Sequence, residues 1–264
     1  MDTIKYLYHY TSIEALALIL KHKTMRLSSL DIVDDLEEAK TTDYGELGRF
    51  CFVSCWTDNS EESIPLWKMY TPNMCGVRIK LPIYPFKEYI INKGEYHFTE
   101  SVESYINLVK IYDNNGFVIN PPFKDFLIEV KYTNDKDLLF PEVYSEHKQA
   151  NTVNKKLKLD ALGTYKNEVW RFQREWRYKI FICPWTLNEL KTSSVESHSK
   201  MFERLKSEQL PFTAFDLELD EWKLEDMEIM IGPKSNEAES VIVNSLVNTY
   251  NPKARITKSS LSIR

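Results

Sequence analysis

Glycine is scarce in this sequence, with only 7 among its 264 residues. So few glycines leave little room for loops that cradle phosphates with backbone N–H groups. Neither the glycine-rich dinucleotide fingerprint nor the phosphate-loop signature occurs. The segment Gly232-Pro-Lys-Ser235 carries a lysine–serine pair but lacks the earlier glycine of such a loop. Nucleotide binding through a glycine-rich loop is therefore excluded.

Cysteine is also sparse, and long apolar runs are missing. The cysteines are Cys51, Cys55, Cys75 and Cys183, and their spacing fits neither a zinc pattern nor a disulfide framework. Cys51 and Cys55 share one face of an expected strand, which favours buried reduced thiols. The first residues lack an apolar signal core, and no apolar run approaches the length of a membrane span. We therefore predict a cytoplasmic protein with no membrane partner and no metal site.

The overall charge is moderately negative rather than basic. A net charge of −5 argues against a general nucleic-acid coat protein, but not against a local basic groove. The hydrophobic share of 43% and the charged share of 28% are typical of a globular chain with a sizeable core. No internal repeat or low-complexity stretch divides the sequence. We expect residues 1–264 to form a single domain.

Residues 170–182 are the most informative stretch of the sequence. With one exception the even positions are aromatic or apolar, whereas the odd positions from 171 to 179 are polar. A period of two predicts a strand with one face on the core and the other on solvent or a cleft. On the polar face Glu175 lies between Gln173 and Arg177, and a carboxylate beside cations keeps its charge. The competing interpretation is a salt-bridge ladder on an exposed face.

His9 is expected where a short aromatic strand meets a helix. Residues 6–10 suit a strand, and Thr11 or Ser12 can cap the helix that follows. Helix N-terminal amides point into such a junction, which makes it a good place for a ligand. A lone histidine there is nevertheless more often structural than functional. A second strand is expected around residues 25–27.

Two further segments bear on a site. Residues 64–70 predict a short helix in which Trp67 and Tyr70, three apart, share one face. Two aromatic side chains on one face indicate either core packing or a platform on which a flat ring stacks. The acidic segment 31–40 lacks the spaced ligands and the glycine of a calcium loop, so a solvated helix start is expected there.

The remaining segments are assigned from their composition and periodicity. Strands are expected at residues 49–56, 75–81, 123–132, 212–219, 227–232 and 254–264, and helices at 102–112 and 236–248. Polar helical insertions are expected near 141–165 and 185–209, with a loop at 192–198. The first insertion is rich in lysine, which is typical of a solvated helix face and less often of phosphate contact.

Several motifs, in this order, resemble the domain-of-unknown-function family 2971. The matching residues are Tyr8-His-Tyr-Thr-Ser12, Asp34-Asp-Leu-Glu-Glu38, Ser54-Cys-Trp-Thr57, Trp67-Lys-Met-Tyr70, Gly76-Val-Arg-Ile79, Lys166, Trp170, Glu175-Trp-Arg177 and Ser260-Leu-Ser-Ile-Arg264. The resemblance covers essentially the whole chain. The chain departs from the family where Asn-Asp-Pro is common, at Asp34-Asp35-Leu36. It departs again at Gln173-Arg174, where a further glutamate is common.

This family looks related to the ADP-ribosyltransferase fold. The resemblance implies an α+β class, a single domain whose split mixed or antiparallel β-sheet is flanked by helices and holds NAD in a cleft. It implies His9, Tyr70 and Glu175 as catalytic residues, with Trp67 as the alternative aromatic. The implied NAD contacts are His9, Tyr10, Thr11, Trp67, Tyr70, Arg78 and Arg177, with Arg26 as a further candidate for the diphosphate. For Arg177 the alternative is a salt bridge to a neighbouring strand.

The implied activity is transfer of ADP-ribose from NAD, the co-substrate, to an unidentified macromolecule, either nucleic acid or protein. Cleavage of the nicotinamide–ribose bond builds positive charge on the ribose, which a preorganised Glu175 would stabilise. A neutral His9 would orient a ribose hydroxyl, and Tyr70 or Trp67 would stack on the nicotinamide. Two alternatives remain open: a non-catalytic nucleotide- or partner-binding module on the same fold, and an NAD glycohydrolase.

Overall fold

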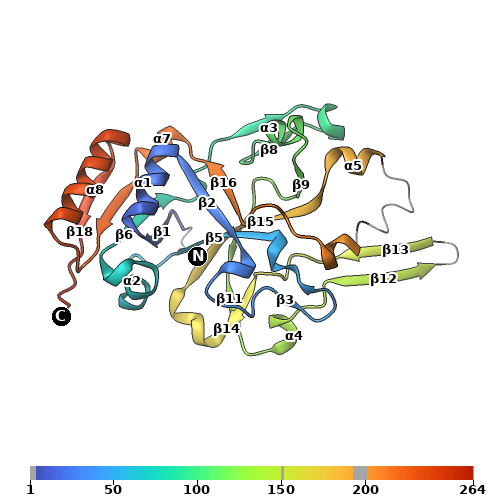
Figure 1. Cartoon of the computed structure of the whole chain (residues 1–264), viewed down its shortest axis with the longest axis horizontal. Helices are drawn as coiled ribbons and strands as arrows, with labels where there is room; N and C mark the ends of the chain where they lie inside the picture. The colour runs from blue at the N-terminus through green and yellow to red at the C-terminus, as the bar shows by residue number, and fades with distance from the viewer. Residues whose placement is uncertain (1–3, 150–151, 193–200, 202, 264) are drawn as a thin grey trace.

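A large mixed β-sheet forms the centre of the computed structural model, which describes residues 4–149, 152–192, 201 and 203–263 (Figure 1). Its ten strands within those residues are β1 (Tyr6–Thr11), β2 (Thr24–Ser29), β5 (Cys51–Thr57), β6 (Val77–Pro82), β9 (Phe117–Asn120), β10 (Leu127–Glu129), β15 (Glu175–Thr186), β16 (Ala214–Glu218), β17 (Glu228–Ile231) and β18 (Arg255–Lys258). The main path runs β10-β15-β5-β1-β6-β17-β18. The β17–β18 pair is parallel and the others are antiparallel, so the sheet is mixed.

The sheet divides at β5. One edge of β5 pairs with β15 from Cys51 to Thr57. The other edge is shared, because β1 pairs with the end of β5 at Thr57, whereas β2 pairs with it at Val53 and Phe52. The sequence of β5 is apolar on both faces because both faces are covered, and every residue except Cys55 is buried. All four cysteines are unpaired thiols.

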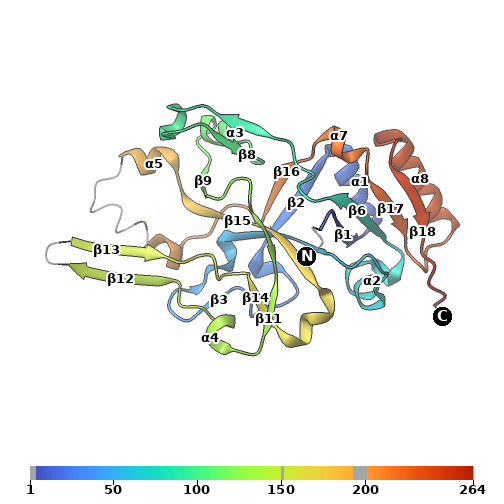
Figure 2. The same ribbon diagram turned by 180° about the vertical axis from the view of Figure 1, so that it is seen from behind.

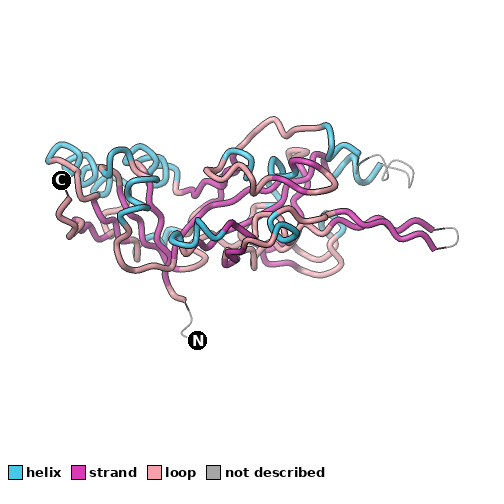
Figure 3. Tube along the Cα trace, turned by 90° about the horizontal axis from the view of Figure 1, so that it is seen from below, coloured by secondary structure: helices cyan, strands magenta, loops and turns pink. Residues whose placement is uncertain are grey.

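Helices α1 (Ile13–His22) and α8 (Glu237–Tyr250) lie beside each other over the sheet at the end that holds β1, β6, β17 and β18 (Figures 1 and 3). The Ser12 hydroxyl accepts from the N–H of Ala15 and begins α1. A reciprocal capping box between Asn236 and Glu239 begins α8. No helix in the described part of the chain combines the length and apolar composition that a membrane crossing requires.

A second, smaller core holds α2 (Ile64–Tyr70) against β1. This cluster consists of Tyr10, Leu66, Trp67 and Met74, covered by Leu261 and Ile263 from the last described residues. Glu62, just before α2, accepts hydrogen bonds from the Trp67 indole N–H at 3.1 Å and from the N–H of Ser260 at 2.9 Å. The chain after β18 therefore packs against α2 and holds it in place.

The smaller elements lie around the main sheet. They are β3 (Lys40–Thr41), β4 (Gly45–Glu46), β7 (Tyr89–Ile91), β8 (Val102–Ser104), β11 (Lys131–Thr133), β14 (Tyr165–Asn167), α3 (Leu108–Asp113), α4 (Lys136–Leu139), α5 (Leu187–Thr192), α7 (Glu221–Leu224), and the 3-10 helices η1 (Leu30–Ile32), η2 (Leu47–Phe50), η3 (Pro72–Met74), η4 (Glu95–His97) and η5 (Glu168–Gln173). The parallel pair β11–β14 is the one that bears on the site, because it carries Lys166.

A helix was predicted for the insertion near 141–165, but its described residues include two paired strands and no helix. Strands β12 (Tyr144–Gln149) and β13 (Thr152–Leu157) pair antiparallel and project from the body of the molecule (Figure 2). At their base, Tyr144 and Leu157 pack against the main core. Lysine-rich composition weakly favours a helix. Here the pairing of β12 with β13 supplies the backbone hydrogen bonds instead.

Most other segment predictions are confirmed, with five corrections. The strand predicted at 170–182 begins only at Glu175, because the Asn167 side chain caps η5 before it. The strand predicted at 254–264 ends at Lys258, because the following residues pack on the second core instead of pairing. The helix predicted at 102–112 is replaced by β8 and then α3, because the Asn107 side chain caps α3 by accepting from Lys110 N–H. The strand predicted at 123–132 is interrupted between β10 and β11. Segment 31–40 is η1 followed by turns, and not a helix start. The insertion near 185–209 begins with α5, and the loop predicted at 192–198 lies, after Thr192, outside the described residues.

Leu7→Ala should lower the free energy of unfolding by about 2–5 kcal/mol, because Leu7 of β1 is fully buried in the main core and truncation leaves a cavity. The matched control is Leu18→Ala on α1, where the leucine is 52% exposed and a change within about 0.5 kcal/mol is expected. Urea unfolding of both variants measures the difference, and equal losses would contradict the assigned core.

Candidate functional site

A small pocket lies where β1, β5, β15 and α2 meet, with a volume of about 80 Å³. Its walls come from residues 8–10, residues 55–57, Leu66 and Tyr70 of α2, and the pair Gln173 and Glu175. Most of these side chains are aromatic or apolar. The pocket is therefore large enough for one small ring and offers that ring mainly apolar contact.

The register of the sheet brings these segments together. Tyr8 of β1 lies opposite Thr57 of β5, and Thr57 lies opposite Glu175 at the start of β15. Three residues far apart in sequence therefore form one row across the sheet. Just before β15, Arg174 takes a left-handed conformation with φ 46° and caps η5. This turn ends the 3-10 helix and starts the strand, so Gln173 and Glu175 both line the pocket.

His9 presents a neutral imidazole to the pocket. Its Nδ1 lies 2.8 Å from the carbonyl oxygen of Cys55, and because a carbonyl only accepts, Nδ1 carries the proton. Burial lowers the pKa of His9 and outweighs the opposing effect of this hydrogen bond. The ring centroid lies 5.0 Å from that of Trp56, which further limits its motion. Nε2 is left as a hydrogen-bond acceptor.

Glu175 is an ionised carboxylate that is only 4% exposed. Its Oε1 lies 2.5 Å from Nε of Arg177, and its Oε2 lies 3.3 Å from Nζ of Lys166. Burial alone would raise the pKa of Glu175, but the two cations outweigh it and lower that pKa to about 2. The backbone N–H of Glu175 donates to the Tyr132 hydroxyl at 2.8 Å, which fixes the main chain at the same point.

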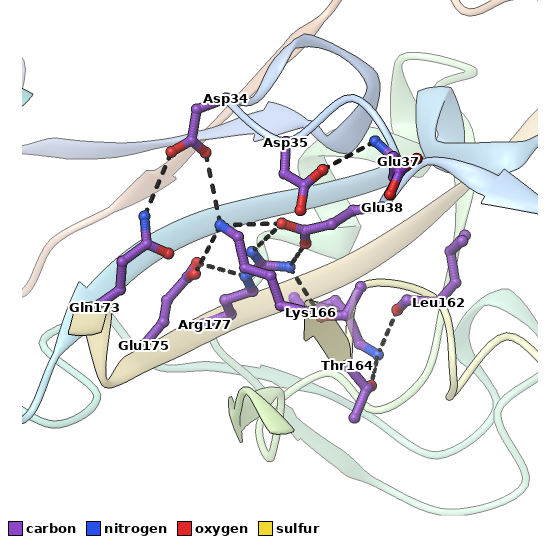
Figure 4. A network of polar contacts seen from close by, with 12 residues as sticks. Asp34, Asp35, Glu37, Glu38, Leu162, Thr164, Lys166, Gln173, Glu175 and Arg177 are labelled. Carbon is purple, nitrogen blue, oxygen red and sulfur yellow. Dashed lines mark hydrogen bonds and ion pairs between the residues drawn. The ribbon is translucent and has the colours of Figure 1, made fainter. Parts of the chain in front are cut away.

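The acidic segment 31–40 completes a buried network of ion pairs around Glu175 (Figure 4). Glu38 is buried and accepts two hydrogen bonds from the guanidinium of Arg177. It also lies 3.0 Å from Lys166, whose Nζ is 3.7 Å from Asp34. The prediction of a solvated helix start is therefore wrong, because these acids face two buried cations. Among the described residues, no group of His, Cys, Asp and Glu side chains is arranged to hold a metal ion.

Tyr70 and Gln173 are joined through Asp34. The Tyr70 hydroxyl donates to the Asp34 carboxylate at 2.6 Å and accepts from the Gln173 amide nitrogen at 2.5 Å. The same amide nitrogen lies 3.4 Å from Asp34. The sequence placed Gln173 on the polar face beside Glu175 but assigned it no role. Its position two residues from the predicted carboxylate was the available signal.

The structure brings four of the predicted site residues into the pocket: His9, Tyr10, Tyr70 and Glu175. The Tyr10 hydroxyl accepts from the N–H of Ser63 at 3.1 Å, and so links β1 to the residue that caps α2.

Two other predicted contacts lie elsewhere. Thr11 pairs with Val77 of β6 and does not line the pocket. Trp67 is fully buried, with its ring 4.8 Å from the Tyr10 ring in an edge arrangement. Stacking of Trp67 on a ligand is therefore a wrong prediction, and the alternative of core packing is confirmed.

The predicted arginines occupy three different environments. Arg177 is 0% exposed, and its guanidinium is occupied by Glu38, Glu175 and a backbone carbonyl. It cannot reach a diphosphate, and the salt bridge it forms is buried rather than part of an exposed ladder. Arg78 lies 4.8 Å over the Tyr8 ring, next to the pocket. Arg26 pairs with Asp216 on strands that do not reach the pocket.

A larger hollow of about 1010 Å³ lies on the surface around α7 and the end of α8. Two of the lysines that line it are paired with glutamates, Lys23 with Glu221 at 2.7 Å and Lys253 with Glu225 at 2.6 Å. None of the predicted site residues lines it. Because such solvated pairs neutralise each other, we take the smaller pocket as the candidate site despite the difference in size.

Comparisons with models of known protein families, with curated proteins and with solved structures found no match. The resemblance to family 2971 therefore stays an interpretation of the motifs.

Arg177→Met should lower the free energy of unfolding by about 3–5 kcal/mol, because it leaves Glu38 and Glu175 buried without their main partner. The matched control is Arg171→Met, which removes an exposed pair with Glu168 and should cost at most about 1 kcal/mol. Chemical unfolding of the two variants provides the measurement. Similar losses in both would show that the buried network does not stabilise the fold.

The contribution of Glu175 to stability should depend on pH. Its folded pKa, about 2, lies below the unfolded value of about 4.3, so the folded state favours the ionised form. This stabilisation is complete above the unfolded pKa and is lost as pH falls toward the folded pKa. The stability difference between wild type and Glu175→Gln should therefore shrink as the pH falls from about 5 to about 2. A difference that grows with acidification would contradict the ion pairing.

Proposed function

We propose that this protein is an NAD-dependent ADP-ribosyltransferase that cleaves the nicotinamide–ribose bond and modifies a macromolecule, either nucleic acid or protein. One observation carries the proposal: His9, Tyr70 and Glu175, from three distant segments, line a single pocket. They are the three residues that the family resemblance assigns to catalysis. The proposal does not depend on Trp67 or Arg177, which the fold uses elsewhere.

The electrostatic states of the pocket suit this chemistry. Glu175 stays ionised, and a fixed carboxylate stabilises a ribose that becomes positively charged in the transition state. His9 is neutral, so its free Nε2 can accept a hydrogen bond from a ribose hydroxyl and orient the sugar. The carboxylate is already held by cations, so it needs little reorganisation when charge develops.

The dimensions of the pocket suit one end of NAD. A volume of about 80 Å³ admits the nicotinamide ring but not the whole dinucleotide. Tyr70, which is partly exposed, would then contact the ring, while the diphosphate would lie outside the pocket. Of the predicted arginines, Arg78 lies over Tyr8 beside the pocket. It is only 7% exposed and donates to the Ser60 carbonyl at 2.9 Å, so it would have to release that partner to bind the diphosphate.

Glu175→Gln should reduce nicotinamide release from NAD by about a hundredfold or more, because the variant keeps the side-chain shape but loses the negative charge. The matched control is Glu129→Gln, an exposed carboxylate on the adjacent strand β10, which should retain wild-type activity. Nicotinamide release by purified protein is measured by chromatography, with thermal unfolding recorded for each variant to separate lost activity from lost fold.

A second variant covers the case in which Glu175→Gln unfolds. His9→Gln keeps an amide N–H that can donate to Cys55, and should lower the rate with the fold intact. Wild-type activity in a folded Glu175→Gln or His9→Gln variant would contradict the proposed mechanism, as would the absence of any NAD cleavage by the wild type.

A non-catalytic nucleotide-binding module is the second candidate. The observation that favours it is that both oxygens of Glu175 are already paired, with Arg177 and Lys166. This candidate predicts that NAD raises the unfolding temperature without releasing nicotinamide. NAD hydrolysis differs from transfer only in that water attacks the ribose. Free ADP-ribose as the sole product, with cell lysate present as a source of acceptors, would identify a glycohydrolase.

A further inference from the structure

The side chain of Gln173 holds one buried polar atom without a partner. Gln173 is only 3% exposed, and it lines the pocket. Its amide nitrogen donates to Tyr70 and approaches Asp34, whereas its Oε1 has no hydrogen-bond partner among the described residues. A buried oxygen without a partner is costly, so such an atom beside a pocket points to a ligand that supplies the missing donor.

The orientation of this amide is set by its neighbours. The Asp34 carboxylate can only accept hydrogen bonds, so the group turned toward it must be the amide nitrogen. The Tyr70 hydroxyl gives its proton to Asp34 and can therefore only accept from Gln173. Rotation of the amide by 180° would place two acceptors face to face. Figure 4 shows the nitrogen turned toward Asp34 and the oxygen toward the side where Glu175 lies.

The other polar groups on the pocket wall include two more acceptors. Glu175 is an ionised carboxylate, and the His9 ring keeps Nε2 unprotonated because Nδ1 donates to Cys55. A ligand that fills this pocket must therefore bring hydrogen-bond donors on a flat, largely apolar body. The nicotinamide ring has that form, because its carboxamide carries two N–H groups on an aromatic ring.

We propose that Gln173 Oε1 accepts a hydrogen bond from the carboxamide N–H of the ligand ring and selects carboxamide-bearing rings, with Asp34 as the positioning residue that fixes the amide. The inference rests on the proposed function, because it assigns the nicotinamide end of NAD to this pocket. It adds a specificity determinant that the three predicted catalytic residues do not supply.

The test compares two nearly isosteric probes, nicotinamide and 3-acetylpyridine, in which a methyl group replaces the amide NH2. The wild type should bind nicotinamide about tenfold more tightly or better, because 3-acetylpyridine leaves the buried oxygen unpaired. In Gln173→Met, which keeps the side-chain length but lacks the oxygen, the two dissociation constants should become similar. NMR titration of the purified full chain measures each constant, and thermal unfolding checks each variant.

Asp34→Asn provides a second test that does not remove Gln173. The new amide would keep its oxygen toward Lys166, which lies 3.7 Å from Asp34, and turn its nitrogen toward Tyr70. The Tyr70 hydroxyl would then donate to Gln173, whose amide would rotate and present its nitrogen to the pocket. The preference for nicotinamide over 3-acetylpyridine should fall to about one or reverse.

The outcomes separate this inference from the enzymatic proposal. Equal binding of both probes by the wild type, binding of neither, or full discrimination retained in Gln173→Met would overturn the role of Gln173. Discrimination without NAD cleavage would support the inference and remove the enzymatic function. Cleavage of NAD without discrimination would leave the enzyme and remove the inference alone.

Discussion

The pairing of Arg177 with Glu38 and Glu175 is the interaction on which the rest of the structure depends. Charged groups lose their hydration when they are buried, and the loss is offset only if every charge finds a partner. Arg177 and Lys166 together meet that condition for both carboxylates. The network therefore ties three separate segments, the turns after η1, strand β14 and the start of β15, into one body.

This network lies directly behind the pocket, so the same contacts serve both the fold and the site. Glu175 belongs to the network through its oxygens and to the pocket through its position on the wall. Its cationic partners keep Glu175 charged despite its burial. An isolated carboxylate in an apolar pocket would have a raised pKa and would tend to be protonated. Structural and functional explanations of Glu175 are thus compatible: the ion pairs that stabilise the fold also orient the carboxylate.

A second set of contacts controls what the pocket can accept. Asp34 joins Tyr70 of α2 to Gln173 of η5, and thereby connects two walls that are remote in sequence. Aromatic groups supply an apolar surface, while Gln173, Glu175 and His9 supply acceptors. Such a pocket favours a flat ring that carries donors. The acidic segment was predicted from its composition to be a solvated helix start. Through Asp34 it instead orients Gln173, the side chain proposed to select the ligand.

Local patterns in the sequence were sufficient for much of the secondary structure. Aromatic and apolar composition predicted β1 and β5, and alternation predicted most of β15. Helical spacing with capping residues predicted α1, α2 and α8, and all of these signals act over a few residues. The large mixed sheet flanked by helices agrees with the expected α+β class. The paired strands β12 and β13 were missed because they are stabilised by each other and not by local propensity.

The tertiary structure alone decided what covers each face and which residues meet. Alternation in β15 separated a polar face from an apolar one, but it could not reveal that Glu38 and Lys166 would cover the polar face and bury it. The convergence of His9, Tyr70 and Glu175 was implied only by the family resemblance. The register of β1, β5 and β15 brings His9 and Glu175 together, and the packing of α2 against β1 adds Tyr70. Strand register and helix packing both depend on contacts between distant segments, which no single segment encodes.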